Sequence, residues 1–167
     1  SEMCIRDSSN WYKKSGYADS LHNDLKIRKY LEKELKSAGL ANVDIERTSE
    51  QVRVTAHTAK PGVAIGKKGV GIDKIRLDLS RIADCNVYFN IAEVKRPDAD
   101  AKLIAENIAA QLEKRVAFRR AMKKVMMSAF RSGVKGIKVR CAGRLGGADM
   151  ARAEGYSERK VPLHTLR

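Results

Sequence analysis

Aromatic side chains are scarce in this chain, at 5% of its 167 residues. Proteins that read nucleic-acid bases by stacking present several aromatic rings on one surface, so a platform of that kind is not expected. The three cysteines, Cys4, Cys85 and Cys141, are too far apart for a metal-ligand motif or a disulfide framework. No apolar run approaches the roughly 20 residues that a membrane-spanning helix needs. The sequence therefore predicts no metal or other cofactor, no membrane span, and a reducing, cytoplasmic environment.

Acidic residues are also few compared with basic residues. The chain has 34 Lys and Arg residues against 20 Asp and Glu residues, which gives a formal net charge of +14. A surface with this excess favours a polyanionic partner, and nucleic acid is the natural candidate. The hydrophobic fraction of 43% is ordinary for a globular protein. The length suits one large domain or two small ones.

The first helix is predicted from Asp24 to Ser37, where apolar residues recur at helical spacing. Asn23 or Asp24 can cap its start, and Gly39 can end it. Alternating apolar residues then predict two strands around residues 43–47 and 52–56, joined by a short turn.

Two helices around a glycine-rich loop follow these strands, and then a further strand around residues 87–91; the longer helix comes after the loop. The helix has one apolar face, formed by Ile72, Ile75, Leu79 and Ile82. A linker is predicted at Arg96-Pro97-Asp98, since proline disfavours helix in the residue before it. The chain is thus expected to divide into residues 9–96 and 97–167.

The second unit is predicted to contain two helices, from Asp100 to Arg115 and from Ala117 to Arg131. A half-buried strand follows at residues 137–141, and a glycine turn at residues 143–147. The fold class is therefore α+β, with two helices and at least one strand in the second unit.

The glycine loop is the most specific motif. Ile65-Gly66-Lys67-Lys68-Gly69, with isoleucines three and six residues later, matches the KH pattern. Two glycines without Cβ let the backbone approach a sugar-phosphate chain, and the next helix directs its first amides at phosphates. Lys67 and Lys68 add positive charge at the tip. The structural alternative is a plain helix-turn-helix corner.

The glycine loop does not have the residue spacing of a nucleotide-hydrolysing motif. A Walker loop requires Lys and then Ser or Thr after its last glycine, whereas Ile72 and Asp73 follow Gly71. The histidines are isolated, and His57, late in a strand, is expected to be structural or at the surface and not catalytic. Sequence spacing supports no catalytic triad or Cys-His set, so no enzymatic centre is expected.

The second signal is a stretch without acidic residues. From Lys114 to Arg144 there are eleven basic residues and no acidic one. At about 100° per residue, five of them fall within an arc of roughly 140° on one helix. These five are Arg119, Arg120, Lys123, Lys124 and Arg131. The apolar residues fall on the opposite side, and Met122, Met126 and Met127 are expected to fill the core. Solvated faces usually mix charge signs, so phosphate contact is favoured.

Several segments, in order, resemble the universal family of small-ribosomal-subunit protein three. They are residues 59–62 leading into the glycine loop, 90–94, 118–123, 143–148 and 161–167. The resemblance implies an N-terminal type II KH domain and a C-terminal ribosomal α/β domain, in which two helices pack on a mostly antiparallel sheet. It implies a structural, non-enzymatic role in the head of the small subunit, bound to ribosomal RNA beside proteins ten and fourteen.

In that family, the helix matching Arg119, Arg120 and Lys123 faces the channel through which messenger RNA enters. With proteins four and five, it is linked to unwinding of messenger structure. The matching motif places Arg144 near the same channel. The alternatives are a free-standing KH regulator, which would usually carry a second Gly-x-x-Gly, and a lysine-dependent lyase for abasic sites, which borohydride trapping would reveal.

Both ends depart from the family. Residues 1–8 resemble the translated read-through of a sequencing adapter. The family continues beyond Arg167 with further strands, so the C-terminal domain is expected to be incomplete. An unpaired sheet edge is then expected beside Ile137–Cys141 or at the terminal strand, and such an edge favours aggregation.

Overall fold

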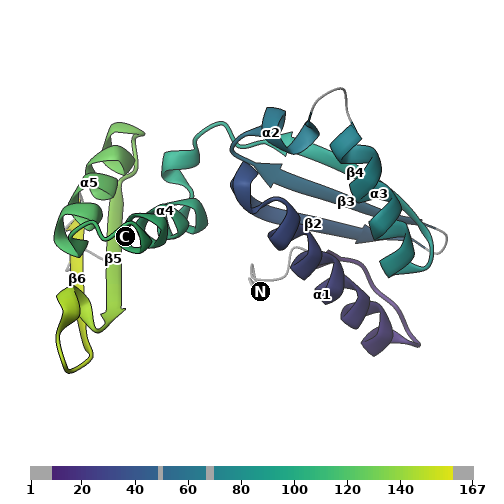
Figure 1. Ribbon diagram of the computed structural model, residues 1–167. Helices are drawn as coiled ribbons and strands as arrows, with labels where there is room; N and C mark the ends of the chain where they lie inside the picture. Colours follow the sequence, from purple (N-terminus) through teal and green to yellow (C-terminus); the bar gives the residue numbers. More distant parts are fainter. Residues whose placement is uncertain (1–8, 49–50, 67–69, 160–167) are drawn as a thin grey trace, which may run out of the picture. The chain divides into compact units, whose positions relative to one another are not determined.

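The computed structural model describes residues 9–48, 51–66 and 70–159. The chain divides into two compact units, the first ending at Lys95 and the second beginning at Arg96 (Figure 1). Each unit has its own hydrophobic core. The suspected adapter, residues 1–8, and the C-terminal residues 160–167 lie outside the described residues.

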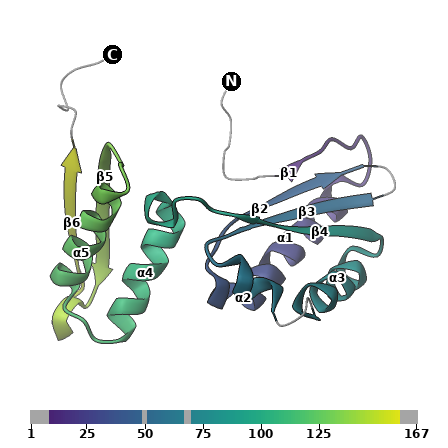
Figure 2. The same ribbon diagram turned by 90° about the horizontal axis from the view of Figure 1, so that it is seen from above.

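Unit 1 is a four-stranded sheet with helices on one face, as Figure 2 shows. The strands lie in the order β1-β2-β3-β4; β2 and β3 are antiparallel, while β1–β2 and β3–β4 are parallel. Its elements are β1 (Ser9–Asn10), α1 (Tyr17–Glu34), the 3-10 turn η1 (Lys36–Ala38), β2 (Leu40–Arg47), β3 (Gln51–Thr58), α2 (Pro61–Ile65), α3 (Val70–Ala83) and β4 (Asn86–Glu93).

The core of unit 1 follows from the alternation of apolar residues in the strands. Alternate residues are buried along β3, over most of β2 and in the first half of β4, as expected for a sheet with one covered face. The core includes Ile27, Leu31, Val43, Ile45, Val52, Val54, Ile75, Leu79, Val87 and Phe89. Tyr30 on α1 also donates a hydrogen bond of 2.6 Å to Asp78 on α3. Burial and this carboxylate raise the pKa of Tyr30.

The start of the first helix was predicted wrongly. The helix α1 begins at Tyr17 after Gly16, which has a left-handed conformation, and not at Asp24. Asp24 is buried within the helix, because its carboxylate takes part in a tertiary ion pair instead of capping backbone amides. The end of the helix was also predicted wrongly, because α1 ends at Glu34 with Leu35 as its C-cap. Gly39, at φ 72°, instead ends the separate 3-10 turn η1.

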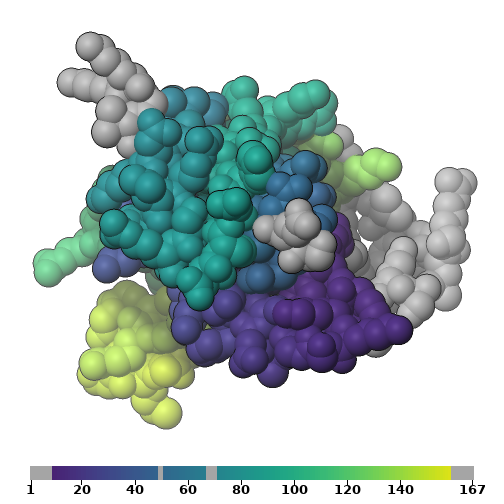
Figure 3. All heavy atoms as spheres, turned by 90° about the vertical axis from the view of Figure 1, so that its right-hand side faces the viewer, coloured from purple at the N-terminus to yellow at the C-terminus, as the bar shows by residue number. Residues whose placement is uncertain are grey.

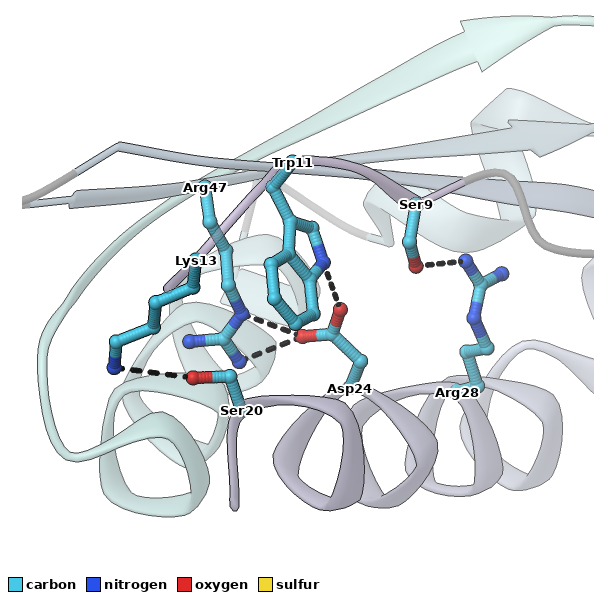
Figure 4. Close-up of polar contacts among 7 residues, drawn as sticks. All are labelled: Ser9, Trp11, Lys13, Ser20, Asp24, Arg28 and Arg47. Atoms are coloured by element: carbon cyan, nitrogen blue, oxygen red, sulfur yellow. Dashed lines mark hydrogen bonds and ion pairs between the residues drawn. The ribbon is translucent and has the colours of Figure 1, made fainter. Parts of the chain in front are cut away.

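The buried carboxylate of Asp24 joins three segments of unit 1 (Figure 4). Trp11 donates its indole N–H to Asp24 Oδ2 at 2.7 Å, and Arg47 at the end of β2 donates Nε–H to Oδ1 at 2.7 Å. The side chain of Asp24 is 1% exposed and that of Arg47 13%. The Arg47 guanidinium also lies 5.9 Å from the centre of the Trp11 ring. One carboxylate thus fixes α1, β2 and the N-terminal segment together.

Arg28 makes a second connection between the same segments. Its Nη1 donates to the Val43 carbonyl at 2.6 Å, and its Nη2 donates to Ser9 Oγ at 2.9 Å. The sequence did not predict the short strand β1, which pairs parallel with β2 beside Ile45 and Glu46. A two-residue strand has no periodicity, so only these tertiary contacts identify it.

Unit 2 consists of two helices and a two-stranded antiparallel sheet. The elements are η3 (Pro97–Ala99), α4 (Ala101–Glu113), α5 (Phe118–Arg131), β5 (Gly136–Gly143), η4 (Leu145–Gly147) and β6 (Arg152–Arg159). Asp100 caps α4 by accepting hydrogen bonds from the backbone N–H groups of Lys102 and Leu103. The core combines Ile108, Met122, Val125, Met126 and Val139. The predicted α+β class is confirmed for both units.

Two details of unit 2 differ from the sequence analysis. Met127 does not fill the core, because its side chain is 63% exposed beside the basic face of α5. The strand β6 was not predicted, since its exposed residues alternate little in polarity. Within the described residues, the side of β5 opposite β6 carries no strand. An apolar groove of about 530 Å³ lies there, between β5 and α4. Further strands beyond Arg167 remain a prediction.

No helix within the described ranges is both long and apolar enough to cross a membrane.

The first prediction concerns Asp24. Replacing Asp24 with Asn should lower the free energy of unfolding by about 3–5 kcal/mol, because it leaves the largely buried guanidinium of Arg47 without its counter-charge. Urea unfolding followed by circular dichroism measures this change. Asp19→Asn is the matched control, since Asp19 is exposed in the first turn of the same helix and should cost at most about 1 kcal/mol. Equal unfolding midpoints for the two variants would contradict a structural role of the ion pair.

Candidate nucleic-acid interface

The backbone of the described part of the glycine loop requires glycine at two positions. The helix α2 ends at Ile65 and α3 begins at Val70. Gly66 adopts φ 69°, which residues with a Cβ rarely adopt. Gly71 is equally constrained, because a Cβ there would lie 3.0 Å from the Ile65 carbonyl oxygen. The tight corner between the two helices therefore depends on both glycines.

Lys67, Lys68 and Gly69 lie outside the described residues, so their part in the site remains a prediction. The start of α3 adjoins them, and its first backbone N–H groups have no partner within the helix itself. A helix N-terminus next to a glycine corner can accept an anionic group such as a phosphate. The Gly71 constraint was not predicted, since its cause is the approach of α2 to α3.

The basic face of α5 is the larger cationic surface. Arg119, Arg120, Lys123, Lys124 and Arg131 are all exposed. The opposite side is buried and contains Ala121, Met122, Val125, Met126 and Ala129. The predicted segregation of charged and apolar sides is therefore confirmed, whereas RNA contact by these residues remains a prediction. We refer to the five exposed cations as the α5 basic face.

The side chain of Glu154 on β6 organises one edge of this face. Arg119 Nη2 and Arg152 Nη2 both lie 3.4 Å from its Oε1 atom. The hydrogen bond and the negative charge of Glu154 raise the pKa of Arg119. Lys123 Nζ lies 5.9 Å from the centre of the Tyr156 ring, also on β6. Arg119 and Lys123 thus lie along β6, with Arg152 beside them.

Arg152 is a cation that the sequence analysis missed. Arg152 lies beyond Asp149 in the sequence, outside the stretch from Lys114 to Arg144 that has no acidic residue and on which the prediction of a basic surface was based. Its side chain is half exposed and shares Glu154 with Arg119. Only the position of β6 beside α5 shows that Arg152 belongs to the same surface as Arg119.

Arg144 belongs to the turn after β5. Its Nε donates to the Ala148 carbonyl at 2.9 Å, and its Nη2 lies 4.0 Å from Asp149 Oδ1. The same turn approaches the start of α5, because a Cβ on Gly146 would lie 4.0 Å from Phe118 Cε1. The structure therefore brings the turn that carries Arg144 close to the Arg119 end of the α5 basic face.

His57 has a structural environment, as expected. Its Nε2 lies 2.7 Å from Asp44 Oδ2 on the adjacent strand β2. Among the residues that the structure describes, no group of three or more His, Cys, Asp or Glu side chains is arranged to hold a metal ion.

Comparison with known proteins agrees with these features. The family described as "KH domain" matches residues 26–99, and the family described as "Ribosomal protein S3, C-terminal domain" matches residues 108–167. Small ribosomal subunit protein uS3 of Anaeromyxobacter dehalogenans is 52% identical over 159 residues, covering 95% of this chain and 71% of that protein.

Two further relatives carry the same name. The uS3 protein of Gluconobacter oxydans is 56% identical over 95% of this chain and 71% of that protein. The uS3 protein of Streptococcus pneumoniae is 54% identical over 98% of this chain and 76% of that protein. Because matches this close extend across both units, the chain belongs to the ribosomal protein S3 family.

Proposed function

We propose that this chain is a structural constituent of the small ribosomal subunit, that it binds ribosomal RNA, and that its α5 basic face contacts messenger RNA. The observation that carries the second half of this proposal is the separation of charge on α5. Five cations are exposed on one side, and the other side is buried in the core of unit 2. A surface of one sign, held on a rigid helix, suits a phosphate backbone.

The proposed position follows from the family. We place the chain in the head of the small subunit, beside proteins ten and fourteen, with the α5 basic face toward the channel through which messenger RNA enters. Proteins four and five would complete this channel. The family is structural and non-enzymatic. Its contribution to messenger unwinding would therefore come from binding the separated strand, without hydrolysis of ATP.

The glycine corner would provide a separate contact with RNA. A phosphate approaching Gly66 would meet the N-terminal amides of α3 and the charges of Lys67 and Lys68. A free-standing KH regulator would not require the C-terminal domain that matches residues 108–167. That match favours the ribosomal role over the regulator.

The second prediction concerns the α5 basic face. Replacing Arg119, Arg120 and Lys123 together with Ala should weaken binding to single-stranded RNA. Each lost phosphate contact should flatten the dependence of log affinity on log salt by about 0.7, and three contacts by about 2. The loss should be similar for different RNA sequences. Fluorescence anisotropy across a salt series measures both quantities.

The matched control replaces three exposed lysines of α1, Lys26, Lys29 and Lys33, with Ala. This control removes the same charge from a helix of unit 1. Stability should change by less than about 0.5 kcal/mol per substitution in either variant. Equal salt slopes in the two variants would show that the α5 basic face is only a solvated surface. In ribosomes, the α5 variant should slow translation of structured messages more than of unstructured ones.

The third prediction concerns the glycine loop. Changing Lys67 and Lys68 to Asp should weaken RNA binding while the circular dichroism spectrum stays the same, because the motif places both residues at the tip of the loop. Lys26→Asp with Lys29→Asp gives the same charge reversal on α1 and serves as the control. If both double variants bind RNA equally well, the glycine corner lies outside the RNA site and is better interpreted as a protein contact.

A further inference from the structure

The few aromatic residues of this chain are unevenly distributed. Of one Trp, five Tyr and three Phe, three lie within seven residues at the N-terminal end of unit 1. Trp11 and Tyr17 have ring centres 5.1 Å apart. Tyr12 is 84% exposed and Tyr17 is 54% exposed. The low aromatic content of the whole chain predicted no stacking platform, but the structure gathers two exposed rings and Trp11 at this one corner. Lys13 and Lys14 lie between Tyr12 and Tyr17 in the sequence.

Four of these residues border a cavity of about 760 Å³: Trp11, Tyr12, Lys13 and Lys14. Its lining comes from the segment before α1, the first turns of α1, the adjoining ends of β2 and β3, and the C-terminal end of α3. Figure 3 looks onto this end of unit 1, with α1 in purple and α3 in teal. A volume of this size falls within the range of small-ligand sites and accommodates a nucleotide.

The walls of the cavity are held in place. Trp11 is fixed by its hydrogen bond to the buried Asp24, and Arg47 is fixed by the same carboxylate. Lys13 Nζ donates to Ser20 Oγ at 3.3 Å, which holds the lysine over the first turn of α1 (Figure 4). A ligand would therefore meet a preformed surface, and the entropy cost of ordering these side chains is already met in the free protein.

We propose that this cavity binds a nucleotide of single-stranded RNA, with Tyr12 stacking on the base and Lys13 and Lys14 contacting the flanking phosphates. The proposal rests on the proposed function, since it adds a second contact for the same class of ligand. Base stacking on an exposed ring combined with lysines for the backbone is the usual chemistry of single-strand binding. Asp19, Ser20 and Asn23 also line the cavity and supply hydrogen-bonding groups for a base edge or a ribose hydroxyl.

This site is distinct from the glycine corner. The glycine loop precedes α3, whereas the cavity contacts Ala83 at the other end of that helix. The 14 residues of α3 separate the two ends by about 21 Å. An RNA strand bound at both sites would span this distance with several nucleotides. The KH unit would then hold a segment of RNA instead of a single phosphate.

The test uses the full chain and a short fluorescein-labelled oligoadenylate. Trp11 is the only tryptophan in the sequence, so its fluorescence reports on this cavity, while fluorescein anisotropy reports on binding anywhere. We expect saturable quenching of Trp11 by the RNA. Tyr12→Ala should weaken the affinity measured by quenching at least about fivefold, the lower end of the effect of one lost base stack. Tyr12→Phe should restore it.

Lys13→Gln with Lys14→Gln should flatten the salt slope by about 1.4, as expected for two phosphate contacts. Lys26→Gln with Lys29→Gln is the control of equal charge. Anisotropy showing binding without Trp11 quenching, or affinity unaffected by Tyr12→Ala, overturns this proposal and leaves the proposed function intact. The aromatic corner would then be a protein contact. Absence of binding by anisotropy overturns both proposals.

Discussion

The carboxylate of Asp24 is the interaction on which the geometry of unit 1 depends. It accepts hydrogen bonds from Trp11 and Arg47, which come from different segments, and it is almost fully buried. A buried ion pair contributes little net stability compared with apolar packing, but its loss is costly because a charge is left without a partner. Its effect is therefore to select one arrangement of α1 against the end of β2 and the segment before the helix.

Basic side chains have different roles in the two units. In unit 1, Arg47 and Arg28 are used internally, joining β2 to α1 and to the N-terminal segment. In unit 2, the cations of α5 remain at the surface, and Glu154 reaches only the edge of the group through Arg119. The same residue type therefore serves architecture in one unit and, on our proposal, RNA binding in the other.

Local patterns in the sequence were enough to predict most elements, whereas long-range contacts were not. The alternation in β2, β3 and β4 and the two-sided character of α5 depend on neighbours a few residues apart, and both were predicted. Asp24 was interpreted as a helix cap because aspartate often occupies that position, and nothing local indicates its partner Arg47, 23 residues later. The contribution of Arg152 to the basic surface was missed for the same reason, since it depends on β6 lying beside Arg119.

The α5 basic face has a cost that a purely structural helix would avoid. Arg119 and Lys123, like Arg120 and Lys124, stand four residues apart, and each like-charged pair destabilises a helix by roughly 0.2–0.5 kcal/mol. The first turn contains no acidic residue to complement the helix dipole. The buried side, where Met122 and Ala129 are fully enclosed, has to offset this repulsion. A bound phosphate backbone would remove it, so the same charges that weaken the free helix are the ones that RNA would stabilise.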